Sequence, residues 1–537
     1  MNKRTIGVLA ALLFAFSGIT AKLYELNSDE TLSVAENQST VKVTVATARG
    51  TIYDSNLQPL TNRGSHYAVS AIAAPQALAA LSHSFSTDEW ETLQSELQGG
   101  KPVIFTAKSP LSPTMGIQQF TTPVRYEETQ LAPHVVGYVG DDGHGVTGAE
   151  LVFDTELSEA AGSITVTYRT DARGNVTEPQ PLSVKNTLFR AKAGVALTLD
   201  SRMQSMVETV AQSRLSKGAV VVMEPQTGNI LAMVSVPSFS PLNIQKYLTA
   251  EDTPLFNRAT AAYNCGSVFK TVSVMAALEA GVPTDRHFLC NGMLKVGSNR
   301  IKCHQTLGHG SLTMFDGYAQ SCNPYFIQLI QETGGEVLYR MACLLGFDSP
   351  LLPAVNFATA RAVFPSLEEL SQPTVLANIS FGQGDLLATP LHIAQMTACI
   401  VNGGEIRRSN LYAGTVDMLG RLTPAEIDPP TPVCSKQTAE IIKDMMIQVV
   451  NDGTGSSAMP KVGGAGGKTG TAETGWVGKD GKTMVQNWFT GFYPAVSPRY
   501  VITVLAEDSG RTREAAAPVF ADVCNYLYRM GYLEENT

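Results

Sequence analysis

Strand-like segments on both sides of a long helical region restrict the possible fold more than any other feature of this sequence. GAVVVMEPQTGNILAMVS (218–235) predicts two strands around a tight turn at Pro225–Gly228. The patterns are mostly helical from residue 255 to about 455, and strand patterns return in NWFTGFYPA (487–495) and RYVITVLA (499–506). We therefore expect an α/β (α+β) domain in which a helical subdomain packs against a central, mainly antiparallel sheet.

The N-terminus predicts a membrane anchor. Lys3 and Arg4 precede TIGVLAALLFAFSGITA (5–21), which carries no charge before Lys22. A run of this length is close to the minimum of roughly 17–25 residues that spans a bilayer. The positive residues would stay in the cytoplasm, so the rest of the chain would lie outside it. A cleaved signal peptide is the alternative, and it would export the same residues.

The length of 537 residues predicts more than one domain. We expect a cytoplasmic tip and transmembrane anchor over 1–21, an elongated α+β module over 22–185, and a larger domain over 186–537. The module begins with an alternating, strand-like TVKVTVAT (40–47), and the larger domain with a strand and a helix capped by Asp200. The net charge of −9 argues against a nucleic-acid partner.

The first candidate site is Ser267 with Lys270. Both lie at the start of SVFKTVSVMAALEAG (267–281), which predicts one helix ended by Gly281. Residues three apart share a helix face, so the two side chains would be adjacent. A desolvated lysine can lose its proton and act as a base toward a hydroxyl. The alternative is a helix-start serine beside a solvated lysine, because the same spacing occurs at Ser39–Lys42 without further signs of chemistry.

Two weaker motifs follow. In QSCNPYF (320–326), Ser321 and Asn323 can face one pocket from a tight turn or extended segment, with Pro324 stopping the backbone. In GGKTGTAE (466–473), a strand edge with flexible glycines presents a cation and hydroxyls, which suits an anionic group. Its candidate binding residues are Lys468, Thr469, Gly470 and Thr471. A phosphate loop would need a glycine where Val462 stands.

The motifs SxxK, SxN and KTG in this order are far more specific than any one of them. With them stand RGTIYDSNLQPL (49–60), HVVGYVG (134–140), GVTGAELVFDTEL (145–157) and FGQGDLLATPLHIAQ (381–395). The chain resembles a class B penicillin-binding protein over nearly its whole length. It departs from the family pattern at Cys265, where a proline is usual, and at Ser55, where an arginine is usual.

The resemblance implies a peptidoglycan D,D-transpeptidase that β-lactams acylate. Ser267 would attack the D-alanyl-D-alanine carbonyl of a stem peptide, and Lys270 would take its proton. Ser321 would relay a proton to the departing D-alanine, and Asn323 would position the substrate amide. The KTG segment would bind the terminal carboxylate, and the N–H groups of Ser267 and Thr471 would form the oxyanion hole. The resemblance implies no cofactor and no metal in this site.

Other functions remain possible for the same motifs. One alternative is a β-lactamase or β-lactam sensor, although E-x-E-L-N is absent and only one span is predicted. Another is a non-catalytic scaffold for wall enzymes, which would have no need of intact motifs. Residues 1–185 lack the glutamate signature of a glycosyltransferase. We therefore expect a membrane glycosyltransferase as partner, with stem peptides on lipid-linked precursor strands as substrate.

The cysteines raise a separate question. All 8 lie from Cys265 onward, which is unlike a disulfide scaffold. Cys290, Cys303, His304 and His309 are close enough in sequence to share a zinc ion. A Cys290–Cys303 disulfide would equally suit the hairpin expected over 291–301, and packed free thiols are the third possibility. The sequence leaves all three open.

Overall fold

The structure is a computed structural model that describes residues 3–28, 39–351, 357, 359–477, 481, 483–507 and 515–533. The chain forms two compact units. The first comprises Met1–Gly50, Asn62–Arg125 and Ser158–Lys192. The second comprises Thr51–Thr61, Tyr126–Leu157 and Ala193–Thr537. Each unit is therefore assembled from segments that are separate in the sequence.

The N-terminal apolar run forms helix α1 (Lys3–Ser28). Its stretch Ile6–Glu25 is long and apolar enough to cross a membrane, and none of it is buried against the rest of the protein. The apolar side chains Phe14 and Phe16 are 84% and 68% exposed. Such exposure is costly in water, so this helix needs an apolar environment. The predicted apolar helix is confirmed.

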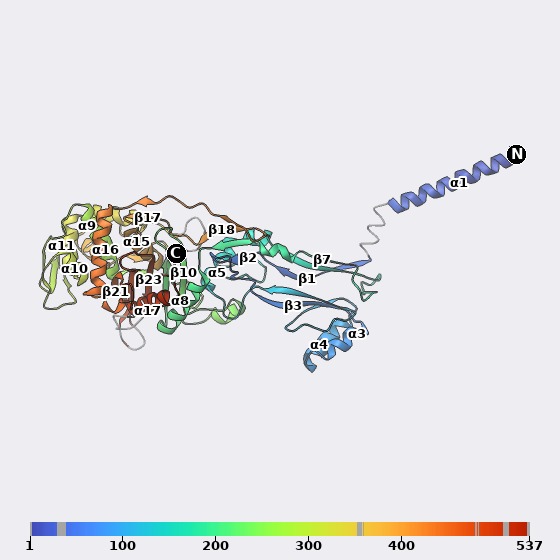
Figure 1. The fold of residues 1–537 in the computed structure, drawn as a ribbon, viewed down its shortest axis with the longest axis horizontal. Coiled ribbons are helices and arrows are strands. Elements are labelled where there is room, and N and C mark those ends of the chain that lie inside the picture. The colour runs from blue at the N-terminus through green and yellow to red at the C-terminus, as the bar shows by residue number, and fades with distance from the viewer. Residues whose placement is uncertain are drawn as a thin grey trace. The chain divides into compact units, whose positions relative to one another are not determined.

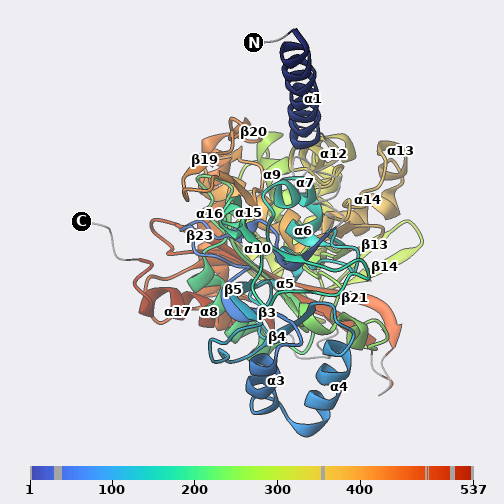
Figure 2. The ribbon, with the colours of Figure 1, turned by 90° about the vertical axis from the view of Figure 1, so that its right-hand side faces the viewer.

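Within its described residues, the first unit contains two small antiparallel sheets. In one, β3 (Gly64–Ala71) lies between β4 (Val103–Ala107) and β5 (Ile117–Val124). Helices α3 (Pro75–Ser82) and α4 (Thr87–Leu97) belong to the same unit (Figure 2). In the other, β6 (Gly162–Arg169) lies between β1 (Thr40–Ala48) and β7 (Ser183–Asn186). The alternating TVKVTVAT segment is thus a strand, as its pattern predicts.

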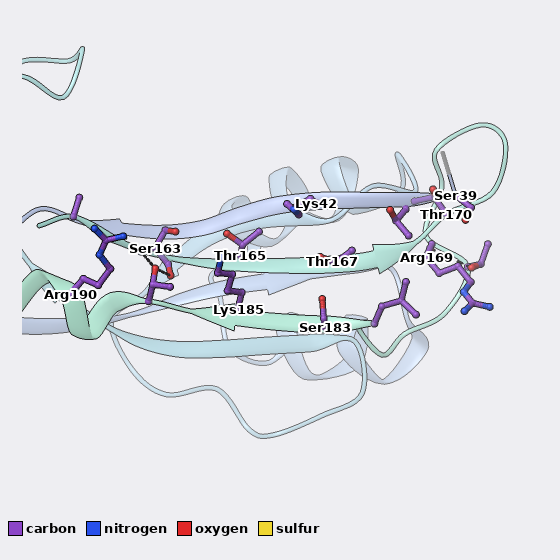
Figure 3. A pocket seen from close by; sticks show the side chains of 15 residues that line it. Ser39, Lys42, Ser163, Thr165, Thr167, Arg169, Thr170, Ser183, Lys185 and Arg190 are labelled. Atoms are coloured by element: carbon purple, nitrogen blue, oxygen red, sulfur yellow. Dashed lines mark hydrogen bonds between the residues drawn. The ribbon is translucent and has the colours of Figure 1, made fainter. Parts of the chain in front are cut away.

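The β1–β6–β7 sheet buries one face and leaves the other polar. Ile164, Val166 and Tyr168 of β6 are fully buried in the core of the unit. The alternate residues Thr165 and Thr167 point to the other face, because successive side chains of a strand alternate. There they line a groove of about 1110 Å³ together with serines, lysines and arginines from all three strands (Figure 3). None of the predicted catalytic residues lies in this groove.

The second unit is built on a five-stranded antiparallel sheet with the order β10–β9–β23–β22–β21. Its strands are β9 (Gly218–Met223), β10 (Ile230–Val236), β21 (Gly466–Val477), β22 (Thr483–Tyr493) and β23 (Tyr500–Ala506). Strands β9 and β10 form the predicted hairpin. Strand β23 pairs with β9, so strands that precede and follow the helical region in the sequence are neighbours in one sheet. The predicted fold class is confirmed.

Helices cover both faces of this sheet (Figure 1). In β9, Val220 and Val222 pack with α8 (Ser201–Arg214) and α17 (Ala516–Arg529), while Ala219 and Val221 belong to the opposite core. The opposite core includes α9 (Lys270–Glu279), α15 (Pro390–Val401) and α16 (Lys436–Asn451). A continuous apolar strand is the expected result of burial on both faces. The Asp200 side chain caps α8 by accepting a hydrogen bond from the N–H of Met203, as predicted.

Strands β10 and β21 are separated in the chain by the helical subdomain, which carries the predicted site residues of the first two motifs. Besides α9, α15 and α16 it contains α10 (Met314–Ala319), α11 (Asn323–Thr333), α12 (Gly335–Leu344), α13 (Leu367–Leu370) and α14 (Pro373–Ser380). Helix α11 packs against α9 and α14. The start of α11 is thereby held beside the start of α9.

Candidate active site

Ser267 lies in a short 3-10 turn, η3 (Gly266–Phe269), that leads directly into α9. The sequence predicted one continuous helix, and the structure corrects this by placing the tighter turn first. Residues i and i+3 are eclipsed in a 3-10 turn, so the predicted adjacency survives. Lys270 Nζ lies 3.0 Å from Ser267 Oγ. Gly281, with φ of 84°, follows the end of α9 as expected.

Two glycines bring the turn of Ser267 against the edge strand β21. A Cβ at Gly266 would lie 2.7 Å from Thr471 O, and one at Gly470 would lie 2.9 Å from Cys265 O. Either contact is closer than real Cβ atoms approach, so a side chain at these positions would push the two segments apart. Gly470 therefore contributes to the site because it has no side chain. The backbone around Ser267 and Thr471 is held close enough to face one substrate carbonyl.

Cys265 replaces the proline usual in the family without adding a reactive group. Its side chain is fully buried, and burial raises the pKa of the thiol to about 12. A protonated thiol behaves here as a small apolar residue. The chain at this point is held by the Trp488 indole N–H, which donates a hydrogen bond to Asn264 O at 2.9 Å. Burial of Cys265 and the hydrogen bond from Trp488 thus hold the backbone where the family usually has a rigid proline.

Lys270 is completely buried, and oxygen atoms surround its amine. The shortest contacts run from Nζ to Ser321 O and to Asn323 Oδ1, each at 2.7 Å. Both atoms can only accept, so they take the two N–H bonds of a neutral amine. The nitrogen lone pair would then face two hydroxyls that can donate to it, Ser267 Oγ at 3.0 Å and Ser321 Oγ at 3.1 Å. A neutral Lys270 therefore lies within reach of the proton of Ser267.

Burial favours this neutral form. Desolvation lowers the pKa of Lys270 from 10.5 to about 7, although the neighbouring thiols Cys322 and Cys303 raise it in part. The Phe326 ring lies under the amine, 5.4 Å from Nζ to the ring centre. A pKa near 7 means that a large fraction of Lys270 is neutral at neutral pH. The alternative of a solvated lysine is excluded by its burial.

Ser321 lies in the turn between α10 and α11, with φ of 52°. A positive φ is unusual for serine and is tolerated where the surroundings fix it, often at functional sites. Its Oγ lies 3.1 Å from Lys270 Nζ and 3.1 Å from Lys468 Nζ. One hydroxyl therefore bridges two amines. Pro324 lies in the first turn of α11, where proline is favoured. The prediction that Pro324 stops the backbone is therefore wrong.

Lys468 reaches this hydroxyl from β21, which is the edge strand that the glycine pattern predicted. The side chain is fully buried, and Nζ also donates to Thr469 O at 3.1 Å. Desolvation first, and then the charge of Lys270, hold the pKa of Lys468 well below its usual range. The Tyr318 ring lies 5.6 Å from Nζ. Thr471 is exposed, and its hydroxyl donates to Asn487 Oδ1 at 3.3 Å.

The structure thus brings the predicted residues of all three motifs into one hydrogen-bonded group. Ser267, Lys270, Ser321, Asn323 and Lys468 are joined by contacts of 2.7–3.1 Å. Thr469 and Thr471 stand beside them on the open edge of the sheet. The group can offer a serine nucleophile, a neutral amine as base, a hydroxyl proton relay and donors for an anion.

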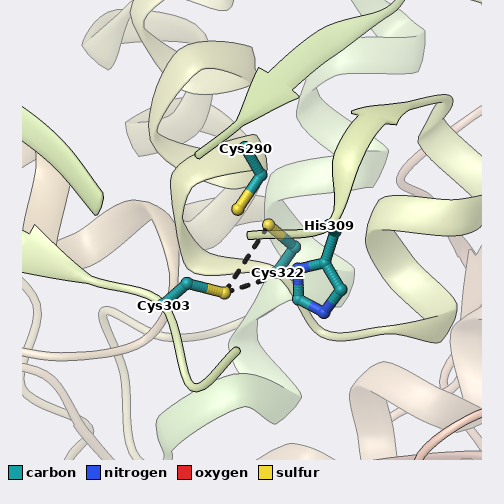
Figure 4. A group of neighbouring side chains, drawn as sticks. All are labelled: Cys290, Cys303, His309 and Cys322. Atoms are coloured by element: carbon teal, nitrogen blue, oxygen red, sulfur yellow. Dashed lines mark hydrogen bonds between the residues drawn. The ribbon is translucent and has the colours of Figure 1, made fainter. Parts of the chain in front are cut away.

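A second group of side chains includes Cys322, the residue that follows Ser321 in the sequence. Ligand atoms of Cys290, Cys303, His309 and Cys322 all lie within 4.8 Å of one another (Figure 4). Cys303 Sγ is 3.4 Å from His309 Nδ1 and 4.0 Å from Cys322 Sγ. The hydrogen bond from Cys322 lowers the pKa of Cys303, which favours a thiolate. The predicted hairpin is present as β13 (Met293–Val296) and β14 (Asn299–Lys302).

Three sulfurs and one nitrogen at this spacing fit a tetrahedral zinc site, whose bonds are about 2.0–2.3 Å long. The sequence suggested His304 as a ligand, but the four converging atoms do not include it. Sequence reasoning missed Cys322, which is the middle residue of the SxN motif. Its position between two expected site residues drew attention away from its sulfur. Cys290 and Cys303 are free thiols in the structure, so they do not form the disulfide that the sequence left open.

Comparisons with known proteins identify the family of this chain. The profile of the family "Penicillin binding protein transpeptidase domain" matches residues 218–525. The chain is 30% identical over 412 residues to stage V sporulation protein D of Bacillus subtilis, covering 74% of this chain and 62% of that protein. It is 31% identical to the peptidoglycan D,D-transpeptidase PbpA of Mycolicibacterium smegmatis, covering 57% of this chain and 65% of that one. The matched regions thus span less than two thirds of these two relatives.

A solved structure shows the same fold. The D,D-transpeptidase domain of a peptidoglycan glycosyltransferase from Eggerthella lenta superposes with a TM-score of 0.65 at 24% identity. The match covers 90% of this chain and 99% of that one. The chain belongs to the penicillin-binding protein transpeptidase family. Within that family it is a class B penicillin-binding protein, and the resemblance inferred from the motifs is confirmed.

Proposed function

We propose that this chain is a serine D,D-transpeptidase that cross-links peptidoglycan stem peptides and is acylated by β-lactams. The observation that carries this proposal is the fully buried Lys270 amine, whose Nζ lies 3.0 Å from Ser267 Oγ and 2.7 Å from both Ser321 O and Asn323 Oδ1. This arrangement activates a hydroxyl that is otherwise a weak nucleophile at neutral pH. The family and the curated relatives named D,D-transpeptidases support it.

In the first step, Ser267 Oγ attacks the carbonyl carbon between the two D-alanines while its proton passes to Lys270. The negative oxygen of the tetrahedral intermediate is held by the N–H groups of Ser267 and Thr471, which the close approach at Gly266 and Gly470 keeps together. Loss of one such donor costs roughly 3–4 kcal/mol in comparable enzymes. The C–N bond then breaks and an ester of Ser267 remains.

The leaving D-alanine needs a proton, and Ser321 is placed to deliver it. Its Oγ lies within 3.1 Å of both amines, so a proton taken by Lys270 can pass through this hydroxyl to the leaving nitrogen. An amine of a second stem peptide then attacks the ester. The bond to Ser267 breaks, the serine recovers its proton, and a new peptide bond joins the two strands. Asn323 orients the substrate amide beside Lys270.

The terminal carboxylate of the substrate would lie at the edge of β21, where Lys468, Thr469 and Thr471 offer a cation and hydroxyl donors. Penicillin carries a carboxylate in the corresponding place, so it should enter the same site. Attack of Ser267 would break the C–N bond of the β-lactam ring, but the leaving nitrogen would stay attached to the acyl group and could not diffuse away, so Ser267 would remain acylated. We infer that antibiotic sensitivity and transpeptidation share these residues.

The proposal is tested by intact-mass spectrometry of the full chain in detergent with penicillin G. We expect one adduct per chain on Ser267 and none on Ser267→Ala, with unchanged circular dichroism. Slow loss of the adduct supports a transpeptidase, whereas rapid turnover would indicate a β-lactamase. Acylation of Ser267→Ala would overturn the assignment of the nucleophile, and a wild type that never acylates would point to a non-catalytic scaffold.

We also propose that the chain is a single-pass plasma-membrane protein and that the residues after helix α1 lie outside the cytoplasm. Lys3 and Arg4, which precede the apolar stretch Ile6–Glu25 of helix α1, support this orientation. Lipid-linked precursor strands are made at the membrane, so an anchored cross-linking enzyme would act beside the glycosyltransferase that extends them. A membrane glycosyltransferase is therefore the partner we propose.

A second candidate function is a structural zinc site formed by Cys290, Cys303, Cys322 and His309. The convergence of four S and N donors within 4.8 Å favours it. Cys290 ends β12 (Phe288–Cys290), and His309 precedes β15 (Gly310–Leu312), which pairs with β12. A bound zinc would supply cross-links between this small sheet, the hairpin and the turn that contains Ser321. It would stabilise that turn without taking part in the reaction.

A further inference from the structure

A threonine outside the three motifs contacts the candidate carboxylate site. Thr454 Oγ1 lies 3.0 Å from Thr469 Oγ1, and this hydroxyl pair is exposed. Thr454 follows α16 in the segment Gly453-Thr454-Gly455, which lies between the end of α10 and β21. No part of the SxxK, SxN or KTG pattern predicts a role for it.

The backbone around Thr454 is tightly held. Its N–H donates to Ala319 O at 3.2 Å, two residues before Ser321. A Cβ at Gly453 would lie 2.8 Å from the same Ala319 O, and one at Gly455 would lie 2.9 Å from a Val449 methyl group. The two glycines therefore let the loop pack against its neighbours at distances that other residues would prevent. Thr454 is consequently a hydroxyl on a fixed backbone, and it is exposed.

The contacts of Lys468 explain why a further hydroxyl would be needed. Its Nζ is buried and directed at Ser321 Oγ and Thr469 O, both inside the protein. The amine thus contributes charge to the site, whereas the exposed donors beside it are hydroxyls. A carboxylate accepts up to four hydrogen bonds. Thr469 and Thr471 lie on one face of β21, about 7 Å apart, so together they leave room for another donor.

We propose that Thr454 and Thr469 act as a hydroxyl pair that binds the C-terminal carboxylate of the D-alanyl substrate. Each hydroxyl carries one proton. One proton closes the hydrogen bond between the two oxygens, and the other is directed at the carboxylate. The internal bond fixes the rotation of both side chains and polarises the donating hydroxyl. Thr454 is in this way a specificity residue for a free terminal carboxylate. This inference rests on the proposed transpeptidase function.

The test compares penicillin G with its methyl ester, which lacks the charge. Acylation rates of the full chain in detergent are measured by intact-mass spectrometry for wild type, Thr454→Val, Thr454→Ser and a control, Thr415→Val. Valine has the shape of threonine without the hydroxyl, and Thr415 is an exposed strand residue of β18 (Tyr412–Val416). We expect Thr454→Val to slow acylation by penicillin G about tenfold and acylation by the ester less than twofold. Thr454→Ser and Thr415→Val should match wild type.

Each outcome separates this inference from the proposed function. If Thr454→Val slows the acid and the ester equally, the residue supports the fold of the site and the inference is wrong. Unchanged acylation by the acid would also refute it. If wild type itself is not acylated on Ser267 by penicillin G, the transpeptidase assignment fails first. Normal thermal unfolding of Thr454→Val would exclude loss of folded protein as the cause of slower acylation.

Discussion

Replacement of Lys270 by methionine should abolish the base and leave the shape of the site. At pH 7 a lysine with a pKa of 10.5 is about 0.03% neutral, whereas one with a pKa of about 7 is about half neutral. The buried position therefore increases the available base by roughly 10³. General-base catalysis typically contributes 10²–10⁴ in rate. We expect Lys270→Met to lower the rate of Ser267 acylation by penicillin G at least 10²-fold.

The pH dependence gives the same prediction a second measurement. Only the neutral amine can accept the serine proton, and its fraction rises as pH rises through the pKa. Acylation of the wild type should therefore increase nearly tenfold per unit below pH 6.5 and level off above pH 7.5. The residual rate of Lys270→Met should lack this rise. Stopped-flow mixing with a chromogenic cephalosporin between pH 5.5 and 8.5 measures both.

Folding must be separated from chemistry in this experiment. Methionine leaves Ser321 O and Asn323 Oδ1 without their donor, which costs about 1–3 kcal/mol for each, but it removes the cost of burying an amine. Lys108→Met, at an exposed position, is the matched control. Thermal unfolding would show whether the variant is folded at the assay temperature. A folded Lys270→Met that acylates within tenfold of wild type would refute the assignment of the base.

Three further predictions follow from the same structure. Lys468→Met should slow acylation by penicillin and by D-alanyl-D-alanine substrates at least tenfold, about 1.4 kcal/mol, while Lys461→Met should have no effect; equal kinetics for both variants would place β21 outside the site. The full chain should contain about one zinc by elemental analysis, and Cys303→Ser but not Cys343→Ser should lose it; with free zinc at 100 times its Kd, removal costs about 2.7 kcal/mol and roughly 5–10 °C in Tm, so an unchanged Tm and metal content after chelation would rule the site out. Exchange of residues 1–21 for a cleavable signal peptide should leave penicillin acylation normal but abolish cross-linking in the cell, and growth on the secreted form alone would show that the anchor is dispensable.

Local sequence patterns were sufficient to predict several of the helices, strands and turns. The alternation in residues 40–47, the turn at Pro225–Gly228 and the cap at Asp200 each depend on neighbours in the chain, and each was predicted correctly. The Ser267–Lys270 pair belongs to the same class, because a spacing of three residues brings side chains together in any helical turn. The apolar run of α1 was equally predictable, since length and hydropathy alone indicate a helix that is long and apolar enough to cross a membrane.

Long-range pairing could not be read in this way. Nothing in β9 or β23 indicates that they are neighbours, because two continuous apolar strands are equally suited to many partners. The left-handed backbone at Ser321 and the opening of α11 at Pro324 also depend on surrounding contacts, and the sequence suggested a stop in the backbone there. Sequence patterns report local preference, whereas these features are imposed by packing.

The sequence by itself determined which residues we predict to carry the chemistry, because a serine, two lysines and their partners stand in a specific order. Only the tertiary structure decided their burial, their protonation and their contacts. Burial of Lys270 lowers its pKa, and the fold places its amine 2.7 Å from Ser321 O and Asn323 Oδ1 and 3.0 Å from Ser267 Oγ. The tertiary structure also places Cys322, and not the predicted His304, among the four converging ligand atoms. It brings the hydroxyl of Thr454 into contact with that of Thr469. Charge, protonation and hydrogen-bond direction depend on what surrounds a group in space, and most of those neighbours are distant in the chain.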